Sequence, residues 1–270
     1  MTPNALTGQI ALVTGAGSGL GAAFARRLAR DGAHVIVNDI DADNATDVAH
    51  EVGGEAAIFD VADAAAFDAA VDGAVDRHGR IDIVVNNAGI APVHEPRQTE
   101  LMIANQMARL TGNLADVAPT DFTVGLSNAD WDRMLKVHLY GTFHGTRAAL
   151  RHMTPARRGA IVNVSSVLGL RPSPAAVSYS VAKAGIISLT RSAGQEVAPF
   201  GVRVNAVCPG WVDTPLLAPF DPVVRSSIEA QIPAGRFAAP DELAELVRFL
   251  AGPEASYCCG DVFTASGGHS

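Results

Sequence analysis

The sequence has little of what marks several common classes of protein. Three cysteines are too few for a disulfide framework, so we interpret them as small packing residues in a reducing compartment. No apolar run is long enough to span a membrane, and the N-terminus lacks the basic and then apolar pattern of a secretion signal. These absences predict a soluble, cytoplasmic protein.

Basic residues are also outnumbered. The chain has 20 Lys and Arg against 28 Asp and Glu, a formal net charge of −8, which disfavours a nucleic-acid or anionic-membrane partner. The eight histidines are scattered without the spacing of a zinc site, so we expect no metal. What the chain does have is 270 residues, 48% of them hydrophobic, which is enough for one large domain with a substantial core.

Tyrosine and lysine are scarce, with three and two residues, yet Tyr179 and Lys183 stand one helical turn apart. An ammonium group beside a phenol favours the phenolate, and a shift of about 3 pKa units, worth about 4 kcal/mol, would bring the phenol near neutrality. A serine from the end of the apolar run 161–166 could then hold a substrate oxygen. The alternative is an ordinary helical pair, which is how we interpret Lys136 and Tyr140.

A glycine-rich turn, TGAGSGLG at residues 14–21, joins an apolar strand at residues 9–13 to a helical pattern. Glycines let the backbone approach a pyrophosphate, and the helix N-terminus supplies N–H donors. The alternative is a tight connection without a ligand. A second strand, residues 34–38, ends at Asp39. In dinucleotide-binding folds an acid at this point hydrogen-bonds the adenosine ribose and repels a 2′-phosphate. Because Asp41 and Asp43 are close in sequence, a simple surface turn is the other interpretation.

Strands and helices alternate along the rest of the chain, which predicts an α/β fold with a doubly wound parallel sheet and helices on both faces. Asp63 is expected to cap one helix, and Ser127 with Asp130 to open a long helix through residue 153 whose buried face carries Trp131, Leu135 and Leu139. Pro240 is expected to open the last helix. The further strands expected are residues 56–59, 81–85, 161–164, 202–207 and 262–264.

Residues 91–128 form an insertion in this single domain of residues 1–270. The segment is polar and rich in turn residues, with a short helix suggested by Ile103, Met107 and Leu110. Connections of this length are uncommon in compact domains. Because it follows the carboxyl end of a strand, we expect it to frame the ligand pocket or an oligomer contact.

The ordered motifs together resemble the short-chain dehydrogenase/reductase family over nearly the whole chain, residues 6–268. The resemblance implies one Rossmann-type domain with about seven parallel strands. The matching motifs are Thr14-Gly-x-x-x-Gly-x-Gly21, Asp60, Asn86-Asn87-Ala88-Gly89, Ser166, Tyr179-x-x-x-Lys183 and Pro209-Gly210.

The resemblance also implies roles for individual residues. Tyr179 would be the general acid/base, Lys183 would lower its pKa and hold the nicotinamide ribose, and Ser166 rather than Ser165 would orient the substrate oxygen. The family's usual catalytic Asn is His138 here, and we expect a proton relay to survive with His138 in a supporting role; the alternative is a core-edge histidine. The cofactor residues expected are Gly15, Ser18, Gly19, Leu20, Gly21, Asp39, Ile40, Asp60, Val61, Asn87, Ala88, Gly89, Tyr179, Lys183, Pro209, Gly210, Val212 and Thr214.

The function predicted is an NAD-dependent oxidoreductase that interconverts a secondary alcohol and a ketone. Leu168, Trp211, Leu216 and Leu217 suggest an apolar, fairly bulky substrate, cyclic or steroid-like, unless they pack under their loop. The alternatives are a 3-oxoacyl-thioester reductase using NADPH and a catalytically silent cofactor-binding regulator. The resemblance further implies a homotetramer or homodimer formed partly by the helices of Trp131 and Tyr179.

Overall fold

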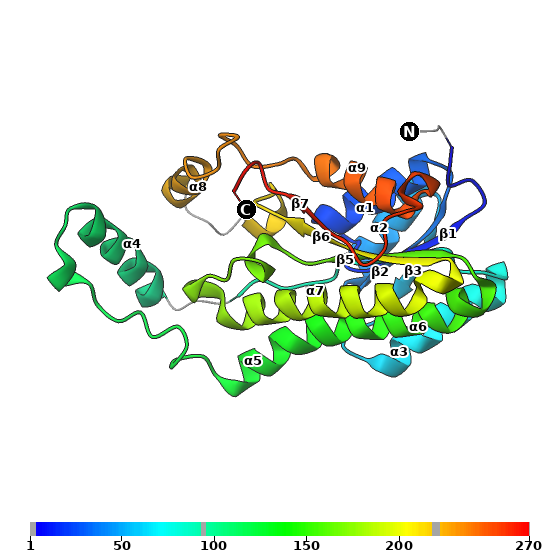
Figure 1. The fold of residues 1–270 in the computed structure, drawn as a ribbon, viewed down its shortest axis with the longest axis horizontal. Coiled ribbons are helices and arrows are strands. Elements are labelled where there is room, and N and C mark those ends of the chain that lie inside the picture. Colours follow the sequence, from blue (N-terminus) through cyan, green and yellow to red (C-terminus); the bar gives the residue numbers. More distant parts are fainter. Residues whose placement is uncertain (1–3, 93–95, 218–221, 270) are drawn as a thin grey trace.

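A seven-stranded parallel sheet forms the centre of the fold (Figure 1). The computed structural model describes residues 4–92, 96–217 and 222–269. In that part of the chain the strand order is β3-β2-β1-β4-β5-β6-β7, so the predicted α/β fold with about seven parallel strands is confirmed. The strands are β1 Ile10–Val13, β2 His34–Asp39, β3 Glu55–Ile58, β4 Ile83–Asn86, β5 Gly159–Val164, β6 Val202–Pro209 and β7 Val262–Ala265.

Helices cover both faces of the sheet. One core cluster joins α1, α2 and α9 to the sheet, and a second joins α3, α6 and α7 to the other face (Figure 1). Burial on both faces explains why the central strands are continuous apolar runs. None of the described helices combines the length and apolar composition needed to cross a bilayer. The helices are α1 Gly19–Arg30, α2 Ala42–Val52, α3 Ala64–His78, α4 Pro96–Leu110, α5 Asn128–Leu135, α6 Gly141–Ala156, α7 Val177–Val197, α8 Pro222–Glu229 and α9 Pro240–Ala251.

The strand order reverses next to β1, which pairs with β2 on one side and β4 on the other. In open parallel sheets, ligands bind outside the carboxyl ends of the strands at such a switch point. The glycine turn that follows β1 and the polar residues that follow β4 and β5 therefore meet at one edge of the sheet. This edge is where the candidate site is built.

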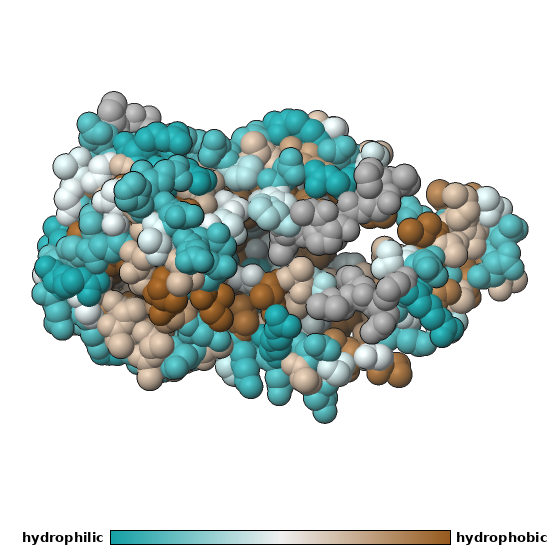
Figure 2. Space-filling model, turned by 180° about the vertical axis from the view of Figure 1, so that it is seen from behind, coloured by the Kyte–Doolittle hydropathy of each residue, from teal (hydrophilic) through white to brown (hydrophobic). Residues whose placement is uncertain are grey.

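The insertion forms an arm, residues 96–127, that projects from the body of the molecule (Figures 1 and 2). Its helix α4 is longer than the short helix expected. Hydrogen bonds join α4 to the segment that follows it within the arm. The Asn105 side chain donates to the Ala118 carbonyl at 2.7 Å and accepts from the Ala118 N–H at 2.8 Å. Ile103, Met107 and Leu110, which suggested the helix, are exposed. A role in framing the pocket or an oligomer contact stays a prediction.

The long helix expected after the arm begins as predicted. The Ser127 hydroxyl accepts from the Asp130 N–H at 3.0 Å and caps α5. A π-helical segment, Lys136–Tyr140, then separates α5 from α6. The predicted buried face is corrected: Trp131, Leu135 and Leu139 are only half-buried, whereas the buried side chains are Met134 and His138. Helix α5 packs against α7, and Met134 is its buried residue.

Candidate active site

The glycine turn after β1 leads directly into the N-terminus of α1. Gly15 and Gly19 have positive φ angles of 61° and 54°, which glycine adopts without strain. A Cβ on Gly21 would lie 2.1 Å from the Gly15 carbonyl oxygen, so only glycine lets the helix pack this closely on the turn. The first turn of α1 has no acidic residue. The exposed backbone N–H groups and positive dipole end therefore fit a diphosphate.

Asp39 lies across this turn, at the end of β2. One carboxylate oxygen accepts from the Gly17 N–H at 2.9 Å, and the other accepts from the Asp41 N–H at 3.1 Å. These two bonds hold the carboxylate beside the glycine turn. An acid that only closes its own surface turn would not bond to Gly17. The adjacent positions, Ser18 and Ile40, are exposed and uncharged. The charge at this end of the glycine turn therefore comes from the Asp39 carboxylate and not from Ser18 or Ile40.

The segment after β4 is fastened to the glycine turn by side chains. The Asn87 amide donates to the carbonyls of Thr14 and Gly15 at 3.0 and 3.1 Å. The Thr14 hydroxyl accepts from the N–H groups of Asn87 and Ala88 at 3.0 and 3.1 Å. Thr14 was not assigned a role from the sequence, although it begins the matching motif. Thr14 therefore holds together the two segments that are predicted to contact the cofactor.

Two further predicted cofactor segments reach the same region. After β3, the Asp60 carboxylate accepts from the Ala62 N–H at 2.9 Å, and the Val61 side chain is buried against α6. After β6, Val212 forms a bridge with Ala238. A Cβ placed on Gly19 would lie 3.7 Å from Cβ of Thr214, so Thr214 lies beside the N-terminus of α1, as a diphosphate contact requires.

Ser165 and Ser166 have different tasks. The Ser165 hydroxyl donates to the Lys183 carbonyl at 2.8 Å and so anchors α7 to the sheet. Ser166 instead acts on Tyr179, whose phenol pKa it lowers, and its hydroxyl accepts from the Leu168 N–H at 3.1 Å. The choice of Ser166 as the residue that orients the substrate oxygen agrees with this geometry.

Lys183 is buried behind Tyr179. Its side chain is on the same face of α7, with Nζ 5.5 Å from the centre of the Tyr179 ring, and it donates to the Val164 carbonyl at 2.8 Å. The residue is 3% exposed. Burial lowers the pKa of its ammonium group to about 7, with Cys208 acting weakly in the opposite direction. The lysine therefore begins to lose its charge near neutral pH in the protein alone.

The pKa of Tyr179 was expected to be lowered, but in the protein without cofactor it is raised. Burial raises the pKa of the phenol, and the hydrogen bond from Ser166 opposes that rise only in part. The same burial reduces the charge on Lys183, the group expected to favour the phenolate. The sequence argument counted the neighbouring charge and omitted the cost of taking both groups out of water.

His138 lies in the π-helical segment and packs edge-on against Tyr179, with ring centres 5.1 Å apart at 81°. Its Nε2 lies 3.0 Å from both the nitrogen and the oxygen of Ile90. A Cβ on Gly89 would lie 2.4 Å from the imidazole, so the ring fills the space that this glycine leaves. Burial first, and then the charge of Lys183, lower the pKa of His138 to about 3. The ring is therefore neutral at physiological pH and positions its neighbours.

We expect His138→Asn to keep most activity, because an amide is also uncharged and polar. His138→Ala should lower kcat by less than roughly 10²-fold, the lower limit for a lost general acid or base, because the support beside Tyr179 disappears while the phenol remains. Rates and pH profiles of both variants check this. The matched control is His50→Ala, at an exposed position of α2. An unchanged rate and pH profile for His138→Ala would show that the side chain has no part in the relay.

A buried polar chain beneath the site was missed by the sequence argument. The Asn86 amide donates to Asn163 at 2.8 Å, and the Asn163 amide donates to the Thr190 hydroxyl at 2.9 Å. These bonds tie β4, β5 and α7 together below Tyr179 and Lys183. The available signal was Asn163 itself, an amide inside the apolar run that forms β5.

The four residues expected to contact substrate behave differently from one another. Leu217 is 5% exposed and packs with Ile232 and Phe237, and Trp211 packs against this cluster. In the protein without ligands, Trp211 and Leu217 therefore pack under their loop, which is the alternative to substrate contact. Leu168 is half-buried and lines a hollow of about 410 Å³ beside α7. The side chain of Leu216 lies outside the described residues.

Comparison with known proteins agrees with this arrangement. The family model described as short chain dehydrogenase matches residues 9–223. The chain is 40% identical over 271 residues to the cis-4-hydroxycyclohexanecarboxylate dehydrogenase of Sinomonas cyclohexanicum, covering 97% of this chain and 96% of that protein. It is 35% identical over 268 residues to the 3-oxoacyl-(acyl-carrier-protein) reductase FabG of Thermotoga maritima, covering 97% and 98%.

A solved structure shares the fold as well. The crystal structure named ribose-5-phosphate isomerase, from Brucella melitensis 16M, matches with a TM-score of 0.84 and 34% identity, covering 99% of this chain and 94% of that one. Because one fold supports many activities, that name remains a statement about that protein. Three findings give the same family. They are the matched family model, the two relatives named as a dehydrogenase and a reductase, and the motifs that meet at one sheet edge. The chain belongs to the short-chain dehydrogenase/reductase family of oxidoreductases, which act on CH–OH groups.

Proposed function

We propose that the protein is an NAD-dependent dehydrogenase of a cyclic secondary alcohol. The observation that carries the proposal is the cluster of Ser166, Tyr179 and Lys183, in which the buried Lys183 amine lies 5.5 Å from the centre of the Tyr179 ring and Ser166 lowers the pKa of the phenol. A silent cofactor-binding regulator would not need this cluster. The cyclic substrate is supported by the relative whose name gives a hydroxyl on a cyclohexane ring.

The chain's own residues move the proton. In alcohol oxidation, Ser166 would hold the substrate oxygen against the Tyr179 phenolate, which takes the hydroxyl proton as the C–O bond becomes a carbonyl. The C–H hydrogen leaves with its electron pair, and accepting that hydride is the chemistry that a bound NAD supplies. The glycine turn and the N-terminus of α1 would hold its diphosphate, and Asp39 its adenosine ribose. In ketone reduction, Tyr179 returns the proton.

Asp39 supports NAD over NADP. A 2′-phosphate would face this carboxylate, and like charges about 4 Å apart near a surface repel by up to about 4 kcal/mol. That energy corresponds to roughly 10³-fold discrimination. The NADPH-dependent alternative is supported by the relative named as an acyl-carrier-protein reductase. Because Ser18 and Ile40 supply no basic side chain to a phosphate at the exposed turn, we favour NAD.

The experiment is an assay of purified protein with NAD⁺ and NADP⁺ on a panel of alcohols. We expect kcat/KM to favour NAD⁺ by roughly 10²-fold or more, and cyclic alcohols such as 4-hydroxycyclohexanecarboxylate to outperform short hydroxy acids. Asp39→Asn keeps the size and one of the two accepting oxygens but removes the charge, so it should raise kcat/KM with NADP⁺ by at least roughly tenfold.

Three outcomes would contradict the proposal. Equal efficiency with the two cofactors would reject the NAD preference, and a preference for short hydroxy acids would reject the bulky substrate. Reduction of 3-oxoacyl thioesters with NADPH well above every alcohol would favour the alternative enzyme. Cofactor binding without turnover on any substrate would favour the regulator.

A further inference from the structure

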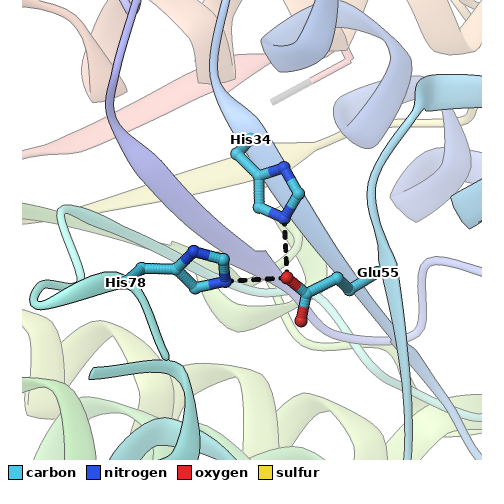
Figure 3. Close-up of side chains that lie close together, drawn as sticks. All are labelled: His34, Glu55 and His78. Atoms are coloured by element: carbon cyan, nitrogen blue, oxygen red, sulfur yellow. Dashed lines mark hydrogen bonds and ion pairs between the residues drawn. The ribbon is translucent and has the colours of Figure 1, made fainter. Parts of the chain in front are cut away.

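Two histidines and a glutamate, His34, His78 and Glu55, converge on one another with the carboxylate between the two rings (Figure 3). Nε2 of His34 lies 2.9 Å from Oε1 of Glu55, and Nε2 of His78 lies 2.7 Å from the same oxygen. The two rings are 4.9 Å apart between centres. One potential ligand atom from each residue lies within 4.8 Å of the other two. We call these three residues the His34–Glu55–His78 triad.

The three side chains come from separate elements whose ends meet. His34 is the first residue of β2, Glu55 is the first residue of β3, and His78 is the last residue of α3. The amino ends of parallel strands lie at the edge opposite the one that binds the cofactor. The triad is therefore outside the site of hydride transfer. The sequence did not reveal it because the residues are 21 and 23 positions apart, whereas zinc-site patterns rely on ligands closer in sequence.

We propose that the His34–Glu55–His78 triad binds a divalent transition-metal ion, with zinc as the best fit. Imidazole nitrogens and a carboxylate oxygen are the ligands that zinc accepts, and two histidines with one glutamate leave a fourth position for water. This proposal departs from the expectation, drawn from the sequence, that the chain binds no metal. The inference is independent of the proposed oxidoreductase activity.

A neighbouring arginine orients the Glu55 carboxylate. Arg77 pairs with the second oxygen of Glu55, with Nη2 and Nε at 3.0 and 3.1 Å, which fixes the carboxylate plane and leaves Oε1 facing the two rings. Burial alone would raise the pKa of Glu55, but its bonds to His34, Arg77 and His78 outweigh this and lower it. The three residues are half-buried, and the Nε2 atom of His78 is itself covered and has no hydrogen-bond partner besides its ion-pair contact with Glu55, so an ion would enter as this ring turns toward it.

We expect a bound ion to stabilise the edge of the sheet. β3 is the terminal strand of the sheet and pairs only with β2 in the strand order of the described residues. An ion held by His34, Glu55 and His78 would join this strand to β2 and to α3. Because the unfolded chain does not bring these ligands together, the ion would bind the folded state preferentially and stabilise it.

The test uses the full, tag-free chain, stripped of metal with chelator and then titrated with ZnCl₂. We expect one zinc per chain with micromolar or tighter Kd, and a rise in Tm of roughly 5 °C or more when free zinc exceeds Kd by a hundredfold. His34→Gln and His78→Gln should each weaken zinc binding by at least roughly tenfold. Using both variants keeps the test valid if one of them folds poorly.

His152→Gln is the matched control. His152 pairs with Asp72 at 2.7 Å, so it has the same histidine–carboxylate contact without a second histidine as ligand. Zinc affinity and the zinc-dependent rise in Tm should be unchanged in this variant. The proposal is overturned if wild-type protein shows no stoichiometric binding, or if His34→Gln and His78→Gln bind zinc as tightly as His152→Gln does.

Discussion

Tyr179→Phe is expected to lower kcat for both alcohol oxidation and ketone reduction by roughly 10²–10⁴-fold, the usual scale for loss of a general acid or base. The change removes only the phenolic oxygen, which is the group whose pKa Ser166 lowers. The ring stays, so its edge-on packing with His138 should be retained. Cofactor affinity and Tm are therefore expected to change little.

Tyr140→Phe is the matched control for this prediction. Tyr140 is 48% exposed and ends the π-helical segment, so the same chemical change there should leave kcat unchanged. Steady-state kinetics of both variants, with cofactor titration to show that binding survives, make the comparison. A loss below tenfold in Tyr179→Phe would remove Tyr179 from the role of acid/base.

The pH dependence of the wild-type enzyme follows from the same residue. Burial raises the pKa of Tyr179, so near neutrality the phenol is protonated. Oxidation needs the phenolate, so its kcat/KM should rise with pH through the neutral and alkaline range. Reduction needs the phenol and should fall at high pH. An oxidation rate that is independent of pH would contradict this assignment.

The sheet and much of the candidate site could be predicted from the sequence because their signals are local. β1 and β5 are apolar runs that end at polar residues, and the rules of parallel sheets then bring those ends to one edge. Asp39 was expected at a strand end beside the glycine turn, and its carboxylate indeed accepts from Gly17. In these cases the local sequence pattern identifies the strand, and the strand in turn fixes where its last residues lie in the sheet.

What the sequence could not predict depends on long-range contacts or on burial. The His34–Glu55–His78 triad exists only because the ends of two strands and a helix meet. The π-helical segment at His138 and the exposed apolar residues of the arm, Ile103, Met107 and Leu110, have no signal in the sequence that distinguishes them from an ordinary buried helix. The pKa of Tyr179 has the direction opposite to the one expected, because desolvation is a property of the folded environment. The oligomeric state stays a prediction.

Lys183→Met is expected to abolish most activity and at the same time to stabilise the protein at pH 6. Activity should fall because the variant removes the amine beside Tyr179 and its contact with the nicotinamide ribose implied by the family. Stability should rise because Lys183 is buried, and its pKa falls from an ordinary value of 10.5 to about 7. That difference corresponds to a cost of up to about 5 kcal/mol for the charged form.

Losing the bond to the Val164 carbonyl offsets part of this gain, at about 1–3 kcal/mol for a buried acceptor left unpaired. A net gain of about 2 kcal/mol would raise Tm by roughly 4–8 °C in a chain of this size. Lys136→Met is the matched control, because Lys136 is exposed and is the only other lysine in the sequence. It should change neither Tm nor kcat.

The sign of the pH dependence separates this explanation from better packing by methionine. Between pH 7 and about pH 10.5 the unfolded wild-type chain holds a proton at Lys183 that the folded chain has released. Wild-type stability from this residue therefore rises with pH across that window, whereas the methionine variant has no such contribution. The Tm advantage of Lys183→Met should be largest at pH 6 and clearly smaller at pH 9. A variant less stable than wild type at pH 6, or an advantage that does not change with pH, would mean that the buried charge carries no such cost.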